Sequence, residues 1–88
     1  MNLLTQRLVL AEAAQLLREG DPKLGADDLS FNGDMLVCKG IPGGLVLTDT
    51  AKQMSVDEFS RKLLVPFLAR MTRLRALQED LAALGMNS

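Results

Sequence analysis

The chain has 88 residues and a net charge of −1, with 48% hydrophobic residues, three phenylalanines and neither tryptophan nor tyrosine. This length predicts one domain, 1–88, near the lower limit for an independent core, in which aliphatic side chains supply most of the packing. The balanced charge excludes a whole-chain attraction to nucleic acid or an anionic membrane. A single cysteine excludes an internal disulfide, and no signal-peptide or membrane-spanning run is present, so we expect a cytoplasmic protein.

The first predicted element is an N-terminal helix from Asn2 to Glu19. Good helix formers fill this stretch, and Gly20-Asp21-Pro22 ends it. The apolar residues form two adjacent stripes, one of Leu3, Leu10, Ala14 and Leu17 and the other of Leu4, Leu8 and Ala11. Because the combined face is wide, we expect this helix to be buried on more than one side.

Residues 29–48 predict a short antiparallel β-hairpin or a three-strand meander. The Asn32-Gly33 pair between apolar runs indicates a hairpin with a type I′ turn, which needs positive φ at both central positions. A second break at 40–44 precedes the last short strand. Met35–Cys38 are all apolar, so we expect both faces of the sheet to be covered, by helices on one face and a second subunit on the other.

A C-terminal helical region from Ser55 to about Leu84 is the longest predicted element. Its first four residues, Ser-Val-Asp-Glu, form a capping box, in which the serine hydroxyl accepts from the amide three residues on and the glutamate reaches back. Pro66 lies inside the region and removes one backbone hydrogen bond, so we expect a kink there, or a break at which the proline opens a second helix. Gly85 fits the left-handed position after a helix end.

An apolar seam with a period of 3.5 residues runs along this region. Such a stripe is typical of a helix that is buried against a partner, within the chain or on another copy. Arg70 is the charged residue in the seam. It could fix register or partner choice, or its stem could cover apolar surface while the guanidinium reaches water. The predicted interaction seam comprises Leu63, Phe67, Arg70, Leu74, Leu77, Leu81 and Leu84.

A basic cluster in the same region supports an alternative function. It comprises Arg61, Lys62, Arg70, Arg73 and Arg75, with no acidic residue between them. Asp57 and Glu58 stand four residues before the first two members, a spacing that favours ion pairs on a solvated face. Arg70 and Arg73 then remain as possible nucleic-acid contacts. No aromatic side chain outside the seam is interleaved for base stacking, so this alternative ranks second.

Catalytic and metal chemistry is poorly supported by the residue types. The chain has no histidine, so Cys38 has no activating imidazole and a structural zinc site is short of ligands. We therefore predict an α+β protein that is not an enzyme and uses no cofactor or metal. The expected function is that of a protein-interaction module, namely a small adaptor, assembly factor or chaperone-like protein that binds itself, as a homodimer, or another protein.

The expected helix–hairpin–helix order is similar to that of small phage head-to-tail joining proteins. In size and acidity the chain is similar to some secretion chaperones. Both likenesses concern layout alone and imply no site residues.

Overall fold

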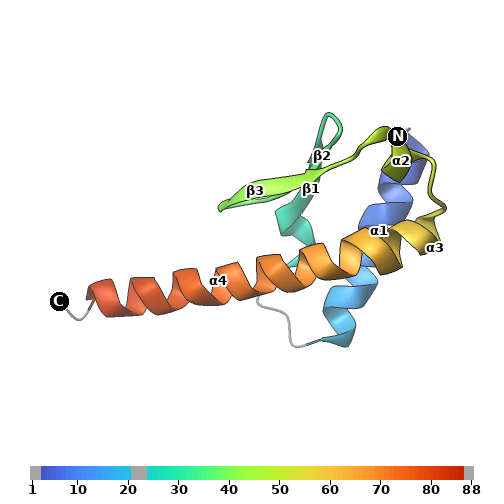
Figure 1. The fold of residues 1–88 in the computed structure, drawn as a ribbon. Coiled ribbons are helices and arrows are strands. Elements are labelled where there is room, and N and C mark those ends of the chain that lie inside the picture. Colours follow the sequence, from blue (N-terminus) through green and yellow to red (C-terminus); the bar gives the residue numbers. More distant parts are fainter. Residues whose placement is uncertain (1–2, 21–23, 87–88) are drawn as a thin grey trace.

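The computed structural model describes residues 3–20 and 24–86, and it has the predicted α+β architecture (Figure 1). An N-terminal helix, a three-stranded antiparallel sheet of order β1-β2-β3 and a long C-terminal helical region follow one another. The first part of the chain comprises α1 (Leu3–Glu19), the 3-10 turn η1 (Ala26–Asp28), β1 (Leu29–Asn32), β2 (Met35–Cys38) and β3 (Ile41–Val46). The second part comprises α2 (Asp49–Lys52), α3 (Val56–Phe59), the π-helical segment η2 (Ser60–Leu64) and α4 (Val65–Met86).

Helix α1 is fully buried along one line of residues and partly buried on either side of it. Val9, Ala13 and Leu17 are spaced four residues apart and are its buried positions. Three of the leucines assigned to the two predicted stripes are instead exposed, namely Leu3, Leu4 and Leu8. Of the predicted wide face, Leu10 and Ala14 are partly buried and Leu17 is buried, whereas the second stripe is exposed at its leucines. The predicted start at Asn2 and the stop at Asp21-Pro22 lie outside the described residues.

The sheet covers the core with one face. Leu29, Leu36 and Cys38 are buried on that face, where α1 contacts β1 and α4 contacts β3. On the opposite face the side chain of Met35 is partly buried, and that of Val46 is 61% exposed. The helical cover on one face is thus confirmed, and the second subunit on the other stays a prediction.

The first hairpin has a turn one residue later than predicted. Asn32 pairs with Met35, so the two-residue loop is Gly33-Asp34. Gly33 has φ 62°, and no described residue other than glycine has positive φ. The type I′ turn was therefore wrong, because a single glycine with positive φ at the first central position matches a type II′ turn.

The second hairpin contains an irregular strand. Val37 pairs with Gly44, whereas Cys38 pairs with Ile41, which leaves 42–43 outside the ladder as a bulge. The loop itself is only two residues long. The Gly-Ile-Pro-Gly-Gly stretch that we predicted as a break is therefore mostly strand, because the bulge accommodates a proline that cannot donate to the ladder.

The C-terminal region begins at the predicted cap. Ser55 Oγ accepts a hydrogen bond from the Glu58 amide at 3.1 Å. Farther on, Val65 N–H donates to the carbonyl of Ser60, five residues back, which is π-helical pairing. An ordinary helical turn would press the ring of Pro66 against the carbonyl four residues before it, and the wider π turn falls at that point.

Helix α4 then continues without interruption to Met86, with Pro66 as its second residue. The expected irregularity at the proline is therefore the π-helical segment just before it. Gly85 lies within α4 and does not have positive φ, so the predicted left-handed end at this position was wrong.

Candidate interaction surface on the C-terminal helix

The structure divides the predicted seam into two parts. Phe67 is 2% exposed, and Leu63 and Leu74 are partly buried against the core. Leu77, Leu81 and Leu84 are 51%, 67% and 67% exposed. Figure 1 shows that the C-terminal end of α4 extends well past the sheet and α1. The molecule accordingly measures 49 × 25 × 19 Å.

The boundary between the two parts lies where the β2–β3 hairpin rests on α4. Arg75 Nη2 donates to the carbonyl oxygen of Lys39 and lies 3.9 Å from Asp28 Oδ2. One turn later, Gln78 Nε2 donates to the carbonyl oxygen of Gly40 at 2.8 Å. Beyond these two residues, positions 79–85 are all exposed. The side chains at the end of the covered part of the seam, Arg75 and Gln78, are polar, and they bind backbone carbonyls of the hairpin turn.

Arg70 lies within the covered part of the seam but is itself exposed. Its guanidinium carbon is 5.6 Å from the ring centroid of Phe67, within cation–π range. This geometry fits a guanidinium held at the surface above an apolar side chain. A cavity of about 190 Å³ opens beside it, lined by Leu45, Lys62, Leu63, Pro66, Phe67 and Arg70.

The basic cluster is dispersed by ion pairs. Arg61 Nε lies 3.2 Å from Asp57 Oδ2, and Lys62 Nζ lies 3.1 Å from Glu58 Oε1, as the four-residue spacing predicts. The fifth member, at position 75, binds the hairpin. Arg70 and Arg73 are exposed and form no ion pair within residues 3–20 and 24–86. The two side chains proposed as nucleic-acid contacts are thus accessible, whereas the other three have structural partners.

Cys38 is a buried core residue. It lies on the covered face of the sheet and is 3% exposed. Burial raises the pKa of its thiol, and the nearby Arg75 guanidinium opposes that rise only in part. The thiol therefore stays protonated at neutral pH. Over the described ranges, no group of three or more histidine, cysteine or carboxylate side chains is arranged to hold a metal ion.

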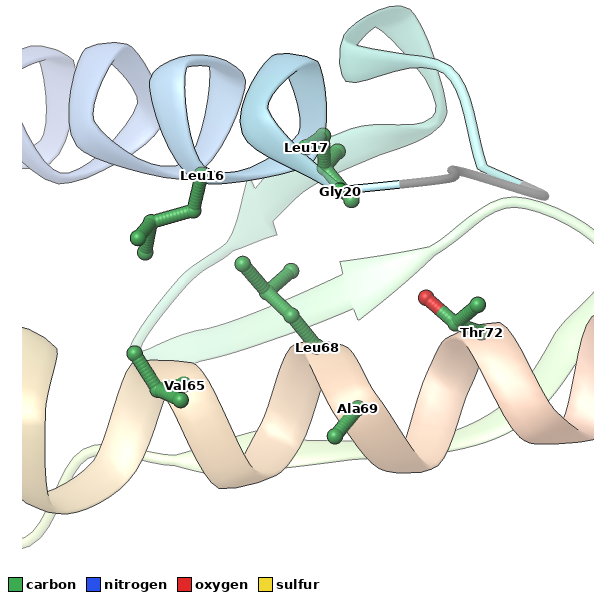
Figure 2. A pocket seen from close by; sticks show the side chains of 7 residues that line it. All are labelled: Leu16, Leu17, Gly20, Val65, Leu68, Ala69 and Thr72. Atoms are coloured by element: carbon green, nitrogen blue, oxygen red, sulfur yellow. The ribbon is translucent and has the colours of Figure 1, made fainter.

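A second concave surface, which the sequence did not reveal, lies between α1 and α4. In Figure 2, Leu16 and Leu17 of α1 face Val65 and Leu68 of α4 across a groove of about 410 Å³. Thr72 supplies the only polar side chain among its lining residues. Ligand sites usually combine an apolar lining with several convergent polar groups. This groove lacks that combination, so we do not assign a small-molecule site to it.

No protein-family model, curated protein or solved structure matches this chain significantly. In the part of the chain that the structure describes, no helix is both long and apolar enough to span a membrane. The candidate function therefore rests on the geometry of the chain itself.

Proposed function

We propose that the protein is a non-enzymatic interaction module, a small adaptor, assembly factor or chaperone-like protein that acts through the exposed part of the α4 seam. One observation carries this proposal. Leu77, Leu81 and Leu84 lie on a single stripe of one helix, and each is more than half exposed. Exposed apolar side chains that line up on one face, unlike single scattered ones, commonly mark an interaction site.

The energetics of helices support the same function. In proteins, most helical stability comes from packing an amphipathic face against other elements, and short helices in water are marginal. The last two turns of α4 have no such packing, since positions 79–85 are all exposed. A partner that covers the seam would supply the burial that the described residues do not provide.

The proposal is tested by measuring the solution mass of the wild type and of Leu77→Asp by light scattering. A charged side chain in a buried contact is costly unless it is paired, so we expect Leu77→Asp to lose the association and to remain folded. Ala83→Asp is the matched control, because Ala83 is exposed on the same helix but outside the seam. If Leu77→Asp unfolds the protein, the stripe belongs to the intrachain core and the proposal fails.

Nucleic-acid binding is the second candidate, and the exposure of Arg70 and Arg73 is the observation that favours it. Binding through phosphate contacts would weaken steeply as salt rises, whereas an apolar contact would hold or strengthen. The measurement is affinity for duplex and single-stranded nucleic acid across a salt series. Undetectable binding at low salt would eliminate this candidate.

A further inference from the structure

We infer that the partner of the seam is a second copy of this chain, docked antiparallel, with Leu84 of each copy at the small cavity beside Phe67 of the other. This inference rests on the proposed function and adds the identity, direction and register of the partner. Three observations support it, namely the distribution of charge along α4, the spacing of the seam and the position of the cavity.

The charges along the exposed stripe favour an antiparallel arrangement. Arg73 lies toward the folded body and Asp80 lies toward the free end of the helix. Both are exposed, and neither forms an ion pair within the described part of the chain. A parallel pair would set Arg73 beside Gln78 of the other copy, because the position before a seam residue then contacts the position after one, and it would gain no ion pair from these charges. An antiparallel pair sets Arg73 of one chain beside Asp80 of the other, twice over.

The seam spacing then selects a register. In an antiparallel pair centred between Leu74 and Leu77, these two leucines face each other across the interface. The same register brings Leu81 opposite Arg70 and Leu84 opposite Phe67. Arg73 and Asp80 both occupy the position just before a seam residue, so this register also places them side by side. Sliding the helices apart by one heptad would lose these ion pairs and bring the two Asp80 side chains together.

The cavity provides a place for the end of the partner's stripe. It lies on the seam side of α4, and Leu45, Leu63 and Phe67 give it apolar walls. Its volume is about 190 Å³. The cavity is open to solvent, and its volume leaves room for the end of an apolar side chain such as leucine. Leu84 of the partner reaches this cavity in the register that the charges select, and the two folded bodies then lie at opposite ends of the overlap.

Arg70 has a defined role in this arrangement. Leu81 of the partner packs on its aliphatic stem, while the guanidinium stays over the Phe67 ring at the edge of the interface. A parallel pair would instead bring the two Arg70 side chains together within the seam. The charged seam residue therefore disfavours the competing arrangement.

Charge reversal tests the direction of docking. Sedimentation equilibrium would be measured for the wild type, for Arg73→Glu, for Asp80→Arg and for the double variant. Each single reversal creates two like-charge contacts, so we expect the dimer dissociation constant to rise about tenfold. The double variant restores two opposite-charge contacts and should return to within about threefold of the wild type. Circular dichroism would verify folding, and Arg61→Glu, a change outside the seam, is the matched control.

A cysteine cross-link gives an independent measurement. In a Cys38→Ser background, Leu84→Cys should form no intermolecular disulfide under mild oxidation, because the two sites lie at opposite ends of an antiparallel overlap. A parallel dimer would cross-link readily through the same substitution.

The outcomes separate this inference from the proposed function. A dimer that cross-links through Leu84→Cys, or whose double charge variant is not rescued, overturns the antiparallel docking and leaves the interaction function in place. A wild type that is monomeric at all concentrations overturns the second copy as the partner. Loss of the dimer in Leu77→Asp with no response to either charge reversal would support the seam and reject the register.

Discussion

The two parts of the C-terminal helical region have the same apolar period but different surroundings. Between Phe59 and Met71, five apolar side chains are buried in the core, namely Phe59, Leu64, Phe67, Leu68 and Met71. From Leu77 onward, the same kind of side chain faces solvent. The comparison shows that a regular stripe predicts a surface that needs cover, but not which molecule or element provides that cover.

The largest expected effect tests the packed part of this region. Phe59→Ala should lower the free energy of unfolding by about 3–5 kcal/mol, because a fully buried ring leaves a cavity. The measurement is urea denaturation at a concentration at which the protein is monomeric. Leu81→Ala is the control in the exposed part and should change stability by less than about 0.5 kcal/mol. Equal losses for the two variants would contradict the division of the helix.

A second prediction concerns the sheet that covers the packed part. A Cβ at Gly44 would lie 2.8 Å from the backbone oxygen of Leu36 and 2.8 Å from Cγ of Met35. Gly44→Ala should therefore force the strands apart and destabilise the protein by about 1–3 kcal/mol. At Gly25 the nearest contact of a new Cβ would be 3.8 Å away, so Gly25→Ala is the matched control. Thermal denaturation of both variants would make the comparison, and an unchanged melting temperature for Gly44→Ala would contradict the close approach.

A smaller effect on stability is expected at the boundary between the covered and the exposed part of the seam. Arg75→Ala removes the donor to the Lys39 carbonyl and the guanidinium near Asp28. Hydrogen bonds to charged groups contribute about 1.5–3 kcal/mol to stability. Because this side chain is partly exposed, we expect Arg75→Ala to lower the free energy of unfolding by an amount near the lower value. Arg61→Ala, whose ion pair is exposed, should cost less than about 1 kcal/mol. Hydrogen exchange of the β2–β3 turn would show whether the hairpin is released.

The smallest expected effect is a pH dependence outside the C-terminal region. Lys52 Nζ lies 2.7 Å from Asp34 Oδ2, and this hydrogen bond lowers the pKa of Asp34 and raises that of Lys52. The contribution of Asp34 to folding stability is therefore present above its unfolded pKa of about 3.9. This contribution is lost as pH falls through the lower pKa of the folded state. The contribution of Lys52 is lost as pH rises through its raised folded pKa.

Asp34→Asn should flatten both limbs of this profile, because it removes the shared partner. The measurement is urea denaturation of the wild type and the variant over a pH series. A variant that retains the full acid limb of the wild type would assign that limb to other carboxylates.

Local chemistry allowed much of the fold to be predicted from the sequence. The serine of the capping box, the helix before Gly20 and the glycine-dependent first hairpin all depend on residues close in the chain. The i,i+4 ion pairs of Arg61 and Lys62 were predictable for the same reason. The burial of Cys38 was predictable from the apolar residues that precede it in the sequence.

Tertiary packing decided what these local patterns do not contain. Burial of α1 along Val9, Ala13 and Leu17, and exposure of Leu3, Leu4 and Leu8, depends on where the sheet and α4 lie. The contacts of Arg75 and Gln78 with the hairpin turn join residues 36 and 38 positions apart. The sequence by itself determined the existence and period of the seam, because side-chain spacing is a local property. Only the tertiary structure decided that the seam is covered as far as Leu74 and open beyond it, because the hairpin ends there.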